Sequence, residues 1–120
     1  GRGLSAVDLA SRQVIDLAAP MDVVTLGLDG LYYYRNSLIG VQNGIGRGRV
    51  LRYDLASPHD IRRVRILESG NSDFETPTTG GICKGSFFFM ANTQLDRTNA
   101  EGVLIADEEL RDIIILRIPL

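Results

Sequence analysis

Residues 27–44 have the sequence GLDGLYYYRNSLIGVQNG, which predicts two short antiparallel strands around a polar turn. The strands are expected at 28–35 and 38–42, because both segments are short and rich in aromatic or β-branched residues. An Asp-Gly step opens the first strand and an Asn-Gly step follows the second. Such steps favour turns, so this part of the chain predicts a β-hairpin.

Further short strands are expected on both sides of this hairpin. They are predicted at residues 3–9, 13–18, 49–55, 61–68, 76–83, 86–92 and 113–120. A polar insert at 94–112 separates the last two strands, and a short helical turn is predicted in it at 106–110. The pattern as a whole predicts an all-β protein.

The chain also resembles itself. When residues 35–37 are placed over 84–86, the strands that follow align without a gap. The segment 50–55 matches 115–120, and it also matches 4–9. A repeat of about 40–50 residues with four strands per unit is typical of a β-propeller blade. A β-sandwich predicts many short strands without such self-similarity.

The repeat divides the 120 residues into parts of a single propeller domain. Residues 1–18 are expected to end one blade, 23–68 to form a complete blade, and 75–120 to form a last blade that lacks its outer strand. Natural propellers have about four to eight blades. Remaining blades, or copies of this chain, are therefore expected to complete the ring. Because the chain starts without methionine in what reads as the middle of a strand, we expect a truncated N-terminus.

Several segments resemble the six-bladed propellers of the SMP-30/gluconolactonase/NHL-like group. They are 28–31, 43–44, 49–55, 73–80, 87–94 and 115–120. Characterised members of that group are lactonases or related hydrolases that hold one divalent cation at a mouth of the central channel. The resemblance therefore implies a small lactone or ester substrate and a Ca²⁺ or Zn²⁺ ion. A non-catalytic NHL-type propeller that serves as a binding scaffold is the alternative.

The same resemblance implies which residues would form the site. Asp29 matches the metal-binding Asp of a Pro-Asp-Gly motif, although Leu28 replaces the proline. Its expected role is to ligate the metal and polarise water or the carbonyl group; the alternative is a turn residue that caps the strand. Glu75, Thr78 and Thr79 precede the other innermost strand and are expected to contact substrate; the alternative is that the threonines satisfy backbone groups in a loop. The other metal ligands would lie in blades outside this chain.

Composition argues against other kinds of partner. The net charge of −2 gives no electrostatic reason to expect nucleic acid, and no apolar run reaches the length of about eighteen residues needed to span a bilayer. The glycines at 44–48 precede a strand rather than a helix, which excludes a dinucleotide fingerprint. The arginines between 47 and 65 are interleaved with acidic residues and predict a solvated outer face.

Three further predictions concern side-chain environment. Asn43 and Asn92 follow equivalent strands, which favours a structural role for both. Cys83, the one cysteine, is predicted to be a buried and inert thiol. The consecutive aromatic residues at 32–34 and 87–89 predict strands that are covered on both faces.

Overall fold

A computed structural model describes residues 3–103 and 110–120 of the chain. This part of the protein contains nine strands and one short 3₁₀ helix, η1 (Leu95–Arg97). The strands are β1 (Ser5–Val7), β2 (Val14–Asp16), β3 (Leu28–Tyr33), β4 (Ser37–Gln42), β5 (Arg49–Ser57), β6 (Asp60–Ser69), β7 (Gly80–Cys83), β8 (Ser86–Met90) and β9 (Ile115–Pro119). Every predicted strand is present, several of them shorter than expected. The predicted helical turn at 106–110 falls almost wholly outside the described residues.

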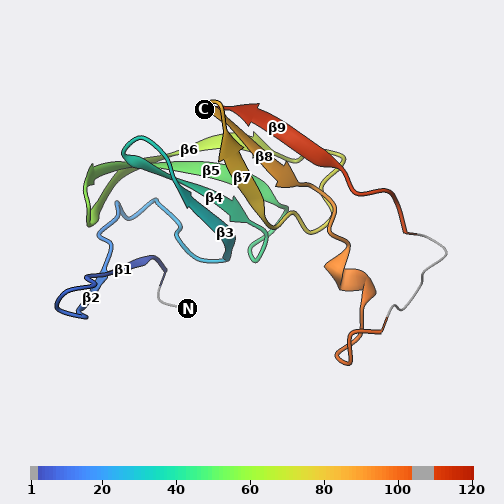
Figure 1. Ribbon diagram of the computed structural model, residues 1–120, viewed down its shortest axis with the longest axis horizontal. Helices are drawn as coiled ribbons and strands as arrows, with labels where there is room; N and C mark the ends of the chain where they lie inside the picture. Colours follow the sequence, from blue (N-terminus) through green and yellow to red (C-terminus); the bar gives the residue numbers. More distant parts are fainter. Residues whose placement is uncertain (1–2, 104–109) are drawn as a thin grey trace.

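The strands form three antiparallel sheets in chain order (Figure 1). A two-stranded hairpin, β1–β2, is followed by a four-stranded sheet, β3–β4–β5–β6, and a three-stranded sheet, β7–β8–β9. Each strand pairs with the next one along the chain. The prediction of an all-β, antiparallel protein is confirmed.

Equivalent tight turns open the second and third sheets. Arg35 and Asn36 join β3 to β4, and both have positive φ angles, of 43° and 57°. Lys84 and Gly85 join β7 to β8 with φ angles of 45° and 72°. Two consecutive left-handed residues in a two-residue loop match the twist of the flanking strands. The predicted alignment of 35–37 with 84–86 is therefore confirmed at the backbone.

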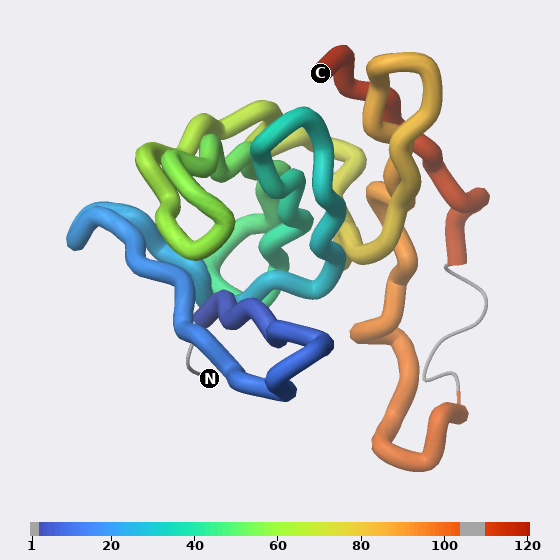
Figure 2. The backbone as a smooth tube through the Cα atoms, turned by 60° about the vertical axis from the view of Figure 1, so that its left-hand side comes forward, coloured from blue at the N-terminus to red at the C-terminus, as the bar shows by residue number. Residues whose placement is uncertain are grey.

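The four-stranded sheet is covered on both faces (Figure 2). On one face Ile39, Val41 and Val50 pack against Phe87 and Phe89 of the third sheet. On the other face a second cluster contacts residues of the N-terminal hairpin and the segment before β3. Its buried members are Leu51, Tyr53, Leu55 and Ile61. The two hydrophobic clusters thus lie between successive sheets, rather than inside any one of them.

Burial contradicts three of the predictions from sequence. Tyr33 is 68% exposed and Phe88 38% exposed, so neither aromatic triplet is covered on both faces. In each triplet the middle ring faces away from its neighbours, because successive side chains alternate across a strand. Cys83 is exposed as well, because it ends β7 beside a turn at the surface.

Asn92 has the predicted structural role. Its side-chain amide donates to the carbonyl oxygen of Asp112 at 2.8 Å and accepts from the backbone nitrogen of Ile114 at 2.6 Å. The buried side chain thereby ties the end of β8 to the segment that enters β9. No helix within residues 3–103 and 110–120 is long and apolar enough to cross a membrane.

Candidate functional site

Asp29 lies at an irregularity in the first strand of the four-stranded sheet. Leu28 pairs with Gln42 and Gly30 pairs with Val41, so Asp29 is an extra residue in the ladder. A bulge of this kind redirects the side chain at that position. The Asp29 side chain is exposed at this end of β3. For this carboxylate the family resemblance implies a role as metal ligand.

Asn43 connects Asp29 to the third sheet. Its Nδ2 atom donates to Asp29 Oδ2 at 3.0 Å and to the carbonyl oxygen of Pro77 at 2.8 Å. The backbone nitrogens of Asn43 and Gly44 both donate to the carbonyl oxygen of Gly27, at 3.2 and 3.1 Å. One residue therefore fixes the entry to β3 and the loop that leads into β7. The predicted structural role of Asn43 is confirmed, and it includes a direct contact with Asp29.

The two sheets approach each other closely beside Asp29. A Cβ atom on Gly30 would lie 2.8 Å from the carbonyl oxygen of Thr78, a distance that only glycine permits here. Farther along the same strands, the backbone nitrogen of Gly80 donates to the Tyr32 hydroxyl at 2.7 Å. Strands β3 and β7 are thus neighbours, although they belong to different sheets.

Two adjoining hollows open between the β4–β5 turn and the β6–β7 loop. One has a volume of about 280 Å³ and is lined by Asn43, Thr76, Pro77 and Asp96 among others. The other, of about 310 Å³, is lined by Arg47, Gly70, Asn71 and Ser72. Gly48 and Phe74 line both.

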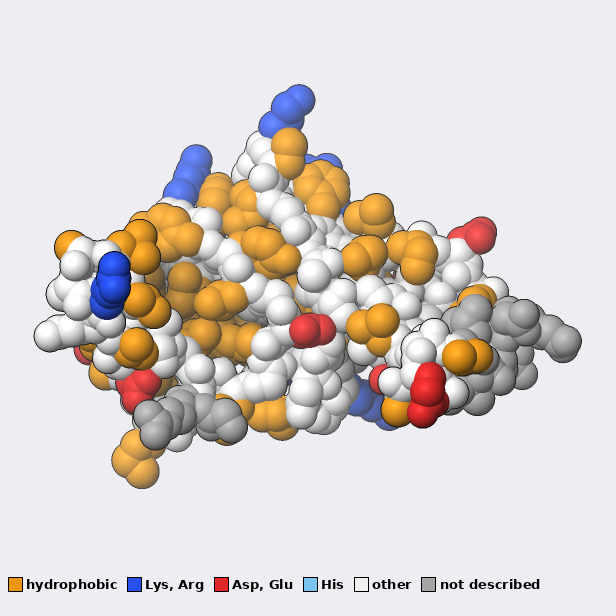
Figure 3. Space-filling view, turned by 60° about the horizontal axis from the view of Figure 1, so that its bottom comes forward, with side chains coloured by type: hydrophobic (Ala, Val, Ile, Leu, Met, Phe, Trp, Pro, Cys, Tyr) orange, Lys and Arg blue, Asp and Glu red, His pale blue; other side chains and the backbone are white. Residues whose placement is uncertain are grey.

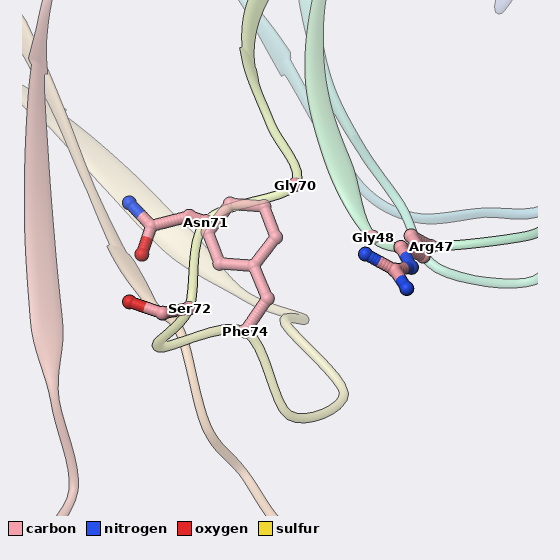
Figure 4. Close-up of a pocket in the computed structure, with 6 residues that line it drawn as sticks. All are labelled: Arg47, Gly48, Gly70, Asn71, Ser72 and Phe74. Atoms are coloured by element: carbon pink, nitrogen blue, oxygen red, sulfur yellow. The ribbon is translucent and has the colours of Figure 1, made fainter.

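Figure 4 shows the second hollow from the side, with Arg47 and the Phe74 ring on its opposite walls. Asn71 and Ser72 come from the same loop as Phe74, and their side chains point away from Arg47. A Cβ atom on Gly48 would lie 2.6 Å from Pro77 Cγ. Because Gly48 has no side chain, the β4–β5 turn can approach Pro77 of the β6–β7 loop this closely.

The predicted substrate-contacting residues do not share one environment. Glu75 forms two ion pairs, with Arg97 Nε at 2.8 Å and with an Arg111 guanidinium nitrogen at 2.7 Å. Hydrogen bonds from Arg97 and then Arg111 lower the pKa of the Glu75 carboxyl. This carboxylate is engaged in holding the insert between β8 and β9 against the β6–β7 loop.

The two threonines have different surroundings. Thr78 is buried, and its backbone nitrogen donates to the carbonyl oxygen of Met90 at 3.3 Å. Thr79 is exposed and lines a shallow apolar hollow with Phe88 and Ile115 on the outer face of the third sheet. Of the two, Thr78 lies beside β3, where its carbonyl oxygen leaves no room for a Cβ atom on Gly30.

The hollows themselves were not predicted from the sequence. Thr76 belongs to one of them; it has a φ of 55° and donates through its hydroxyl to Asp96 Oδ2 at 2.8 Å. The available signal was positional. The loop at 43–48 joins β4 to β5 and the loop at 70–79 follows β6, so in an antiparallel sheet both lie at the same end, and a glycine-rich turn there leaves space for a neighbouring loop.

The residues described here do not by themselves fit a divalent cation. Within 3–103 and 110–120, no three His, Cys, Asp or Glu side chains lie close enough to hold a metal ion. Ca²⁺ takes about six to eight oxygen ligands, and catalytic Zn²⁺ about three protein ligands. Asp29 would supply one of them, and the Asn43 Nδ2 atom that donates to it is not a metal ligand.

Comparison of the chain with protein-family models, curated proteins and solved structures found no match.

Proposed function

We propose that this chain forms the last blades of a β-propeller similar to the SMP-30/gluconolactonase group. Residues 1–18 would end one blade, 23–68 form a complete blade, and 75–120 form a blade that lacks its outer strand. Three observations support this proposal: the successive antiparallel sheets, the hydrophobic clusters between them, and the contact between first strands β3 and β7.

The outer face of the third sheet also supports it. Phe88 occupies the position that Ile39 occupies in the second sheet, yet Ile39 is 0% exposed and Phe88 is 38% exposed. Ile115, the counterpart of the buried Val50, is exposed too. Apolar side chains are also exposed over much of the face shown in Figure 3. A further blade packed on the third sheet would bury its outer face.

The proposed activity is hydrolysis of a small lactone or ester. The observation that carries it is the exposed Asp29 carboxylate, which projects at the end of an innermost strand beside the two hollows. Asn43 holds Oδ2 of this carboxylate. Together with ligands from other blades, Asp29 would serve as one oxygen ligand of a Ca²⁺ or Zn²⁺ ion, and Thr78 would shape the mouth beside it. The chain alone is then not catalytically competent.

Lactone turnover, measured with and without Ca²⁺ or Zn²⁺, tests this proposal. The measurement uses a polypeptide that carries this chain together with the remaining blades. Asp29→Ala is expected to abolish turnover, whereas Asp22→Ala, a change at an exposed aspartate before β3, is expected to preserve it. Retained turnover in Asp29→Ala would remove Asp29 from the mechanism.

A second candidate function is a non-catalytic NHL-type scaffold. It is favoured by the engagement of Glu75 with two arginines and by the lack of a carboxylate cluster among the described residues. On this alternative the complete propeller shows no metal-dependent turnover, and Asp29→Ala changes neither activity nor metal binding.

A further inference from the structure

Strand β9 forms the outer edge of the third sheet (Figure 1). It pairs with β8 along one side, from Ile115 opposite Met90 to Pro119 opposite Ser86. No strand of residues 3–103 or 110–120 pairs with its other side. In the second sheet the equivalent side of β5 carries β6 over almost its whole length.

The apolar residues on the inner face of β9 are only partly covered. Leu116 and Ile118 pack against the cluster between the second and third sheets and are half-buried. Their counterparts in β5, Leu51 and Tyr53, are fully buried against the preceding layer. Val64 of β6 pairs directly with Tyr53 and packs against the same cluster. The incomplete burial in β9 therefore coincides with the lack of a neighbour at the position of β6.

The backbone of β9 has hydrogen-bonding groups that point outward at this edge. The nitrogen of Leu120 donates to Gly85, and the carbonyl oxygen of Ile114 accepts from Ala91. Because the direction of these groups alternates along an antiparallel strand, those of residues 115, 117 and 119 point away from β8. Pro119 has no N–H group, so the edge offers donors at 115 and 117 and acceptors at all three.

Arg117 gives this edge its charge. It is exposed, and its Nε atom donates to Ser86 Oγ at 3.0 Å. In β5 the matching Arg52 lies 3.3 Å from Asp54, which also pairs with two arginines of β6. Pro119 replaces that aspartate in β9. Among the described residues no carboxylate forms an ion pair with Arg117.

We propose that the outer edge of β9 binds an extended, acidic segment of a partner polypeptide as an added antiparallel strand. The backbone of the segment would bond to residues 115, 117 and 119. A carboxylate on the segment would lie opposite Arg117, and an apolar residue next to it in the segment would cover Ile118. This inference does not depend on the proposed hydrolase activity.

Pairing between two copies of β9 fits this edge less well. In an antiparallel pair centred on Arg117, the two guanidinium groups would lie opposite each other, and like charges in that position destabilise a sheet. Pro119 would also fail to donate to the second copy. A carboxylate-bearing strand avoids the charge repulsion at Arg117, and the pair then lacks only the one donor of Pro119 in β9.

Fluorescence anisotropy with two labelled peptides tests the proposal. One has the sequence of β6, residues 60–69, and the other carries the changes Arg63→Glu and Arg65→Glu in that sequence. The position of Arg65 corresponds to the place opposite Arg117, because Arg65 pairs with Arg52. We expect the acidic peptide to bind about three- to tenfold more tightly, because one glutamate lies opposite Arg117 and the other lies diagonal to it, where the parent peptide has two arginines.

Protein variants and a modified peptide complete the design. Arg117→Glu is expected to reverse the preference between the two peptides, whereas Arg47→Glu, at an exposed position in the β4–β5 turn, preserves it. Methylating the backbone nitrogens of the acidic peptide that face β9 is expected to abolish binding, since strand addition needs those donors. Equal binding of both peptides, or binding that survives N-methylation, would overturn the proposal. A second result would also overturn it. In that result the acidic peptide fails to bind, and sedimentation velocity shows a dimer that Arg117→Glu abolishes or strengthens.

Discussion

The hydroxyl oxygen of Tyr32 lies 2.7 Å from the backbone nitrogen of Gly80, and this hydrogen bond joins the first strands of two different sheets. The Tyr32 ring also packs against Phe87, with ring centroids 5.1 Å apart. One side chain thus combines an apolar contact with a polar one across the boundary between the sheets. The relative position of β3 and β7 depends on both.

Replacing Tyr32 with phenylalanine separates the two contributions. Tyr32→Phe keeps the ring on Phe87 and removes the acceptor for the Gly80 N–H, so we expect the free energy of unfolding to fall by about 1 kcal/mol. Urea denaturation monitored by circular dichroism measures the change. Tyr33→Phe is the control, because the Tyr33 hydroxyl accepts only a 3.2 Å bond in an exposed turn. An equal loss in both variants would contradict a special role for the bond between the sheets.

Gly80 and Gly81 provide a matched pair of substitutions. A Cβ atom on Gly80 would lie 2.7 Å from Phe87 Cζ and 2.8 Å from Phe89 Cβ, and it would also clash with the carbonyl oxygen of Phe88. A Cβ atom on Gly81 would meet nothing within 4 Å. We expect Gly80→Ala to lower the free energy of unfolding by about 1–3 kcal/mol or more and Gly81→Ala to leave it nearly unchanged. Similar urea midpoints for the two variants would contradict the close contacts described for a Cβ atom on Gly80.

The strands and their order could be predicted from the sequence because the signals are local. Aromatic and β-branched runs, bounded by turn residues, define each strand. The match between residues 35–37 and 84–86 reflects a shared backbone requirement, a two-residue turn with positive φ at both positions. Such information resides in a few consecutive residues, and no knowledge of the distant chain is needed to use it.

Burial and side-chain partners could not be predicted in the same way. Tyr33 and Phe88 have the composition of covered strand residues, but their exposure depends on whether another layer lies above them. Glu75 pairs with Arg111, which is 36 residues away in the sequence, so this partner could not be found from local pattern. The hollows near Asp29 depend on the approach of the β4–β5 turn to the loop that connects the second and third sheets. These features arise from tertiary contacts, which local pattern does not encode.

The ion pairs of Glu75 predict a change in local stability. Glu75→Gln removes the charge that holds Arg97 and Arg111, so the insert after β8 and the segment entering β9 should open more often. We expect faster amide hydrogen exchange at 94–99 and 110–112, measured by mass spectrometry, with little change in β4 and β5. Glu101→Gln, at an exposed position in the same insert, should leave the exchange unchanged. Equal exchange in Glu75→Gln and the parent would mean that the ion pairs contribute nothing there.

Asp54 predicts how stability depends on acid. Partial burial of its carboxyl raises the pKa, but hydrogen bonds and positive charge from Arg65 and Arg63 outweigh this and lower the pKa to about 2. Because the unfolded chain binds the proton near a pH of about 4, the ion pairs stabilise the folded state fully above that pH. The contribution is then lost as the pH falls toward 2.

We therefore expect Asp54→Asn to be less stable than the parent chain by about 1–2 kcal/mol at pH 6, after allowance for solvent screening of the arginines. The difference should shrink steadily below pH about 4 and be small near pH 2, because the parent carboxylate is then protonated as well. Salt should reduce it at pH 6, since the arginines are partly exposed. Urea denaturation at a series of pH values measures the effect, with Asp22→Asn as a control at an exposed aspartate. A difference that does not change with pH would mean that the loss in Asp54→Asn comes from packing and not from charge.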